Sequence, residues 1–140
     1  MKILQKIIII FIVLAFINST ANAQFGYKND YETIDGVGIS YKWAKSKWWK
    51  KSSPKQLRFK MKNTNDSKVA IKFELVYLLD HIVKFQSGTL ETEIKAGKAL
   101  SGKLNGFYFE SPDIPNKKLE SEKFDWEFLF FEVTPLKENE

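Results

Sequence analysis

The chain has 140 residues, a formal net charge of +5, a single histidine and no cysteine. These numbers exclude a disulfide-held scaffold, a cysteine-based zinc site and a two-histidine metal site within one chain. The charge is only mildly basic, and we expect no nucleic-acid partner.

The first 23 residues have the pattern of a secretory signal peptide. Lys2 and Lys6 flank the start of an apolar run of eleven residues, 7–17, and small side chains follow at Ala21 and Ala23. This is the order of a basic region, an apolar region and a cleavage site. An uncleaved membrane anchor is the alternative, but a spanning helix needs about 20 apolar residues. We therefore expect cleavage after Ala23, export to the periplasm or the extracellular space, and no stable membrane span afterwards.

Removal of the signal leaves 117 residues, the size of one domain. The net charge of this mature part falls to +3, because Lys2 and Lys6 leave with the signal. The absence of cysteine also excludes a lipid attached at a new N-terminal cysteine. The expected organisation is a signal peptide at 1–23, a leader at 24–35, a β-sandwich domain at 36–135 and a tail at 136–140.

Alternation of apolar and polar residues, typical of strands with one buried face, dominates the mature chain. It is clearest at residues 37–43, 57–61 and 69–77, and the polar stretch 63–67 predicts a turn between the last two. A proline-containing loop at 110–122 has room for one helical turn around 117–122. Shorter or later strands are expected at 82–86, 90–94, 100–104, 107–109 and 124–134.

Seven or eight short strands without a convincing helical period predict an all-β fold of two packed antiparallel sheets. The segments GVGISYKW, LRFKMKNTNDSKVAIKFELVY and SGKLNGFYF together resemble the small exported immunoglobulin-like β-sandwich proteins of bacteria that have no assigned function. The resemblance spans most of residues 36–133 and implies a single immunoglobulin-like β-sandwich. It implies no site residues, and the disulfide and buried-Trp signature of antibody domains is absent.

Polar side chains offer little for catalysis or metal binding. His81 follows Asp80 in an expected turn and is best explained as a solvent-exposed histidine. Glu91 and Glu93 are expected on the outer face of one strand. A loose acidic group lacks the spacing of a calcium-binding loop and is expected to be a solvated leader: Asp30, Glu32 and Asp35. We therefore expect no metal, no cofactor and no enzymatic activity.

The best candidate for a binding surface follows the first clear strand. Trp48 and Trp49 stand among lysines there, and two neighbouring residues cannot both face one core. An exposed Trp beside lysines can stack on a sugar ring and attract an anionic group, which suits an acidic polysaccharide or a lipid headgroup. The commoner use of Trp favours another arrangement, in which one Trp plugs the end of the sandwich and lysine stems cover the other. The candidate ligand-binding residues are Lys47, Trp48, Trp49, Lys50 and Lys51.

The last expected strand is apolar on both parities from Leu129 onward. A β-bulge near residues 129–131 would switch which alternate residues face the core. Alternatively, the 110–122 loop would cover the outer side of the strand there, so that both sets of alternate residues are buried. Cover by a partner chain is the third explanation and ranks behind these two. In that case the interaction face would consist of Leu129, Phe131 and Val133.

These patterns predict an exported, non-enzymatic module of the cell envelope or extracellular space that binds an unknown partner. One version is a protein-interaction module that uses strand edges or the face around Leu129. The other is a module that binds an acidic glycan through Trp48 and Trp49.

Overall fold

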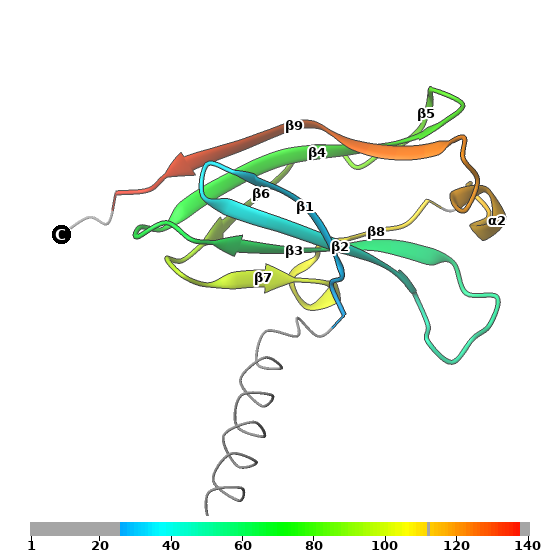
Figure 1. Ribbon diagram of the computed structural model, residues 1–140, viewed down its shortest axis with the longest axis horizontal. Helices are drawn as coiled ribbons and strands as arrows, with labels where there is room; N and C mark the ends of the chain where they lie inside the picture. The colour runs from blue at the N-terminus through cyan, green and yellow to red at the C-terminus, as the bar shows by residue number, and fades with distance from the viewer. Residues whose placement is uncertain (1–25, 112, 138–140) are drawn as a thin grey trace, which may run out of the picture.

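The computed structural model describes residues 26–111 and 113–137, and the predicted signal peptide lies outside these ranges. Two antiparallel sheets pack face to face, with β9 and β4 in one layer and β2, β3 and β7 in the other (Figure 1). The prediction of an all-β sandwich is confirmed. In the part of the chain that the structure describes, no helix has the length and apolar character needed to cross a membrane.

The first sheet is built around two long central strands, and β7 and β8 follow each other along the far edge of β3. In the order of the sheet its members are β1 (Asn29–Ile34), β2 (Val37–Lys45), β3 (Lys55–Asn63), β7 (Ala99–Ser101) and β8 (Tyr108–Phe109).

The second sheet has β4 (Val69–Leu79) at its centre. The strand β9 (Phe124–Pro135) pairs with the whole length of β4 on one side. On the other side, β5 (Ile82–Gln86) and β6 (Leu90–Ile94) occupy successive parts of β4. The helical turn expected around 117–122 is α2 (Asn116–Leu119), which begins one residue before the predicted stretch and ends three residues before its end.

The leader expected at residues 24–35 contains the edge strand β1, so the sheet begins before residue 36. Its alternation is hidden because most of its side chains are exposed and because Tyr31 is an extra residue in the pairing with β2. Asp35 and Gly36 both have positive φ angles (45° and 78°), as a two-residue hairpin turn between β1 and β2 requires.

The strand expected at residues 100–104 ends early, at Ser101. Gly102 and Gly106 have φ angles of 57° and 77° and bracket the short 3-10 helix η1 (Lys103–Asn105). Because these positive angles turn the backbone away from the strand, Leu104 is exposed and is not an inward-facing strand residue.

The predicted turn after β3 depends on Asn63, whose side chain is buried. Its Nδ2 donates to the carbonyls of Ser67 (2.8 Å) and Ile94 (3.0 Å), and its Oδ1 accepts from the backbone nitrogen of Asn65 (3.0 Å). A polar residue is therefore stable at the end of a core strand because each of its groups is hydrogen-bonded.

The β-bulge expected in the last strand is present. Phe128 pairs with Leu75 and Phe130 pairs with Glu74, which leaves Leu129 as the additional residue of β9. The parity that faces the core therefore changes at this point, as an inserted residue requires.

The bulge turns Phe131 and Val133 towards the core, where both pack against buried residues. Leu129 alone of the predicted interaction face is exposed, at 56% of its surface. The three residues therefore do not form one exposed face, because the switch in parity places two of them inside.

Aromatic side chains fill the space between the sheets. Phe128 of β9 lies between Phe59 of the first sheet (5.3 Å between ring centroids) and Phe73 of the second (5.6 Å). Phe73 also stacks on Phe131 at 5.8 Å. Edge-to-face and offset contacts of this kind add to the free energy gained by burying the rings.

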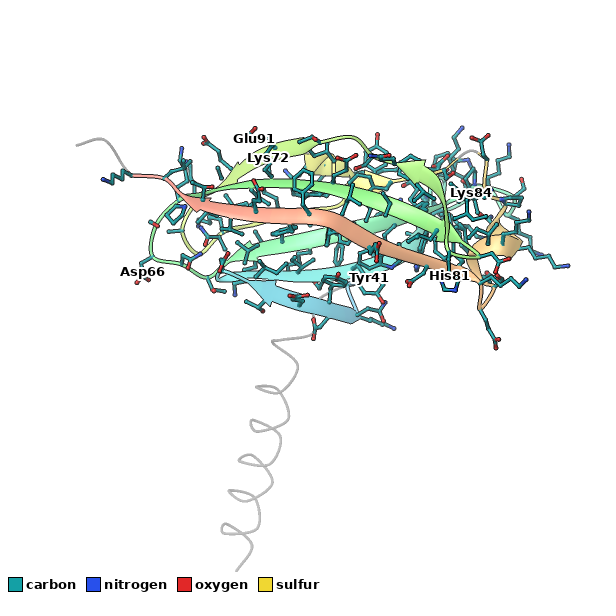
Figure 2. The ribbon with its side chains drawn as sticks, turned by 90° about the horizontal axis from the view of Figure 1, so that it is seen from above. Tyr41, Asp66, Lys72, His81, Lys84 and Glu91 are labelled. Carbon is teal, nitrogen blue, oxygen red and sulfur yellow. The ribbon has the colours of Figure 1, made fainter. Side chains whose placement is uncertain are left out.

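We expect Phe73→Ala to lower the free energy of unfolding by about 3 to 5 kcal/mol, because it removes a fully buried ring. The matched control is Lys72→Ala, on the outer face opposite Glu91 (Figure 2), with an expected change of about 0.5 kcal/mol or less. Urea denaturation followed by circular dichroism measures both. Equal losses in the two variants would contradict the assignment of the two faces of β4.

Deletion of Leu129 should leave a cooperatively folded protein, because the residues on both sides of the bulge keep their partners on β4. Deletion of Glu127 instead shifts the first part of β9 by one residue and moves Trp126 to the outer face, so we expect loss of the cooperative thermal transition. Differential scanning calorimetry of the two deletion variants compares them directly. Loss of the transition in both would mean that the bulge itself is required for folding.

Candidate functional site

The loop at residues 46–54 joins β2 to β3 and extends away from the second sheet (Figure 1). It exposes 84% of the Trp48 surface and 68% of the Trp49 surface. The two rings are nearly perpendicular (86°), with centroids 5.8 Å apart. The expectation that one of them plugs the end of the sandwich is therefore wrong. Trp43 packs inward instead, against Tyr77 and Phe124.

Ser53 fixes the base of this loop. Its buried hydroxyl lies 2.6 Å from the Ser46 hydroxyl and accepts a hydrogen bond from the Lys47 backbone nitrogen at 2.9 Å. Asn116 of α2 donates to the Ser53 carbonyl at 3.0 Å, so the loop is also tied to a distant segment. The two Trp side chains therefore project from a base that is held in place before any ligand binds, which lowers the entropic cost of binding.

An open hollow of about 470 Å³ lies between the loop and the outer face of the first sheet. Arg58 of β3 enters it, held by hydrogen bonds from Nη2 to the Lys45 carbonyl (2.9 Å) and to Oε1 of Gln56 (3.1 Å). Lys103 of η1 reaches it from the other side and donates to the Ser46 carbonyl at 2.6 Å. Among the described residues that line the hollow, none is acidic.

We call the loop and the cations around it the Trp–Lys surface. None of its basic residues takes part in the ion pairs found among the described residues, so no salt bridge neutralises their charge there. The surface combines two exposed indole rings with positive charge and is able to hold an anion beside an apolar contact. Its members are Lys45, Lys47, Trp48, Trp49, Lys50, Lys51, Arg58 and Lys103.

More cations extend the positive charge across the outer face of the first sheet. Lys42 pairs with Arg58, and Lys60 and Lys62 follow along β3. Tyr27 lies over this face, with the Lys42 ammonium 4.6 Å from its ring centroid. Burial raises the pKa of the Tyr27 phenol above its ordinary value, while a hydrogen bond with Ser101 and the charge of Arg58 act in the opposite direction.

Sequence reasoning missed Arg58 and Lys103 as members of the surface. The sequence did contain a signal for Arg58, because it is one of the polar residues that alternate with the buried residues of β3 and therefore faces outward. Lys103 had none, since 57 residues separate it from Ser46 and only the fold brings the two together.

The remaining polar candidates do not converge on a site. His81 lies in the β4–β5 turn and is exposed (Figure 2). Asp30 and Glu32 belong to β1, and Asp35 lies in the hairpin turn that follows. Within residues 26–111 and 113–137, no group of three or more histidine or carboxylate side chains is arranged to hold a metal ion.

Comparison with protein-family models, with curated proteins and with solved structures finds no match for this chain. Its function therefore has to be argued from its own residues.

Proposed function

We propose that the mature chain is an exported, non-enzymatic binding module that holds an anionic ligand on the Trp–Lys surface. The observation that carries this proposal is the exposure of Trp48 and Trp49 beside fixed cations. An exposed aromatic pair loses the free energy that burial would give, and exposed apolar surface of this kind marks interaction sites.

The ligand must offer negative charge next to an apolar face. An acidic polysaccharide does so through its carboxylates or sulfates and the flat side of its sugar rings, and a lipid does so through its headgroup and acyl chains. Arg58 and Lys103 would bind the anionic group, and one of the two indole rings would contact the apolar part. A protein partner is less well supported, because the bulge leaves Leu129 as the exposed member of its predicted face.

We also propose an immunoglobulin-like architecture in the sense of layers and strand number. The successive strands β5 and β6 follow one edge, and β7 and β8 follow another. The nine strands found in residues 26–111 and 113–137 therefore occupy four positions in one sheet and three in the other. Immunoglobulin constant domains have the same division. In those domains the last two strands are neighbours, whereas here β8 and β9 belong to different sheets, so the proposal does not extend to connectivity.

Export predicts the mass of the mature protein. Protein recovered from the periplasm or the culture medium should begin at Gln24, or at its pyroglutamate form, when its intact mass is measured. The basis is the small residues that precede the predicted cleavage point. Membrane-bound protein that retains residues 1–23 would contradict this part of the proposal.

Binding should require both exposed indoles. We expect W48A/W49A to lose affinity for anionic probes by about tenfold or more, with a nearly unchanged melting temperature, because neither ring is part of the core. Two probes cover the two chemistries: an immobilised sulfated polysaccharide, and monomeric dihexanoyl phosphatidylglycerol. Dextran and dihexanoyl phosphatidylcholine are their uncharged or zwitterionic counterparts.

The matched control variant is I82A/V83A, which removes two exposed aliphatic side chains from β5. It should bind both probes as the wild type does. The proposal would be wrong if the wild type bound neither anionic probe, or if folded W48A/W49A bound them with wild-type affinity.

A further inference from the structure

We infer that the anionic ligand is the surface of a phospholipid bilayer containing anionic lipids, on which the outer face of the first sheet lies. This inference rests on the proposed function and names its ligand. It is carried by a third exposed apolar side chain beside the Trp–Lys surface, together with the distribution of charge over the two faces of the sandwich.

The third apolar side chain is Leu104 of η1, with 98% of its surface exposed. The hydrogen bond from Lys103 to the Ser46 carbonyl joins η1 to the Trp-containing loop, so Leu104 lies next to the Trp–Lys surface. The ammonium of Lys103 also lies 5.9 Å from the ring centroid of Tyr108, which is partly exposed on β8. Two loops that are distant in sequence therefore present apolar tips among cations.

An aliphatic tip suits a bilayer better than a sugar. Sugars are held by stacking on flat aromatic faces and by hydrogen bonds, and a fully exposed leucine supplies neither. The perpendicular rings of Trp48 and Trp49 also provide no common plane for two adjacent sugars. Trp is enriched at the membrane interface, and leucine side chains gain free energy when they enter the boundary between headgroups and acyl chains.

The positive charge lies where contact with an anionic bilayer requires it. Outward cations on β2 and β3 continue from the Trp–Lys surface across the first sheet. The acidic residues near them lie at its two edges: Asp30 and Glu32 belong to β1, and Glu110, directly after β8, accepts a hydrogen bond from Gln56 at 2.8 Å. Basic residues near an anionic membrane surface are attracted to it within the range of screening.

The opposite face of the sandwich carries carboxylates. On the outer side of the second sheet, Glu91 and Glu132 flank Lys72 on β4, and Glu127 and Asp125 follow along β9 (Figure 2 labels Lys72 and Glu91). The molecule therefore has one basic and one acidic face. A negatively charged plane attracts the first and repels the second, which fixes the orientation of the bound protein.

The test is a vesicle flotation assay with the mature chain, residues 24–140. We expect binding to phosphatidylcholine vesicles that contain phosphatidylglycerol and much weaker binding to phosphatidylcholine alone. Tryptophan emission should shift to shorter wavelength on binding, and lipids brominated in the acyl chains should quench it. In W48A/W49A, which keeps Trp43 and Trp126, both signals should disappear.

Leu104→Ser separates the bilayer from a polysaccharide. It should weaken vesicle binding about tenfold, because it removes an inserted apolar side chain, and leave retention on the sulfated polysaccharide unchanged. Ile82→Ser, at an exposed aliphatic residue of β5 away from the Trp–Lys surface, is the control and should bind vesicles as the wild type does.

Each alternative result has a distinct meaning. Retention on the polysaccharide without binding to anionic vesicles would overturn this inference and leave the proposed function intact, with a glycan as the ligand. Failure to bind the anionic vesicles, the polysaccharide or dihexanoyl phosphatidylglycerol would overturn both. The inference would also be overturned if Leu104→Ser bound vesicles as the wild type does and the tryptophan emission did not shift. That result would show electrostatic attraction to the bilayer without insertion of apolar side chains.

Discussion

Aromatic packing between the two sheets is the interaction on which the rest of the structure depends. The chain has no cysteine, so the layers are held by side-chain contacts and not by a covalent link. Phe128 contacts both Phe59 and Phe73 and so joins the first sheet to the second. The bulge at Leu129 belongs to the same arrangement, because without a change of parity Phe131 would not stack on Phe73.

The arrangement of the core also determines the charge on the surface. On β3, Leu57, Phe59 and Met61 are buried, so Arg58 and Lys60 must face outward. On β9 the inward turn of Trp126 and Phe128 directs Asp125 and Glu127 to the outer side of the second sheet. The basic and acidic faces therefore follow from which residues each strand buries in the core.

Most strands and turns were predictable, because a half-buried strand leaves period two in the sequence. β4 and β9 are examples, and the turn at Asn63 followed from polar side chains that bond to the backbone. β1 was missed, since an edge strand with exposed side chains on both faces and a bulge at Tyr31 leaves no such period. The strand expected through Leu104 failed because Gly102 adopts a positive φ angle.

The candidate site was predictable in part. Because Trp48 and Trp49 are neighbours in the sequence, they were not expected to enter one core together. The general preference of Trp for burial nevertheless favoured an arrangement in which one of them plugs the end of the sandwich, and this was wrong. What decided their exposure was local: the buried Ser53 anchors the loop through polar contacts, and Trp43 fills the inward position instead. The contribution of Lys103 depends on a hydrogen bond between distant segments, which no local pattern contains.

The net charge is a poor guide to the charge that each face of this protein presents. A net charge of +3 for the predicted mature chain suggested no strong preference for any partner. A partner, however, responds to the charge within about 8 to 10 Å of the surface it meets, the screening length at physiological salt. Because cations predominate on the outer faces of β2 and β3 and carboxylates predominate on the outer face of the second sheet, each face presents a charge that the sum conceals. The arrangement of residues on the strands, and not their number, therefore sets the electrostatic character of the Trp–Lys surface.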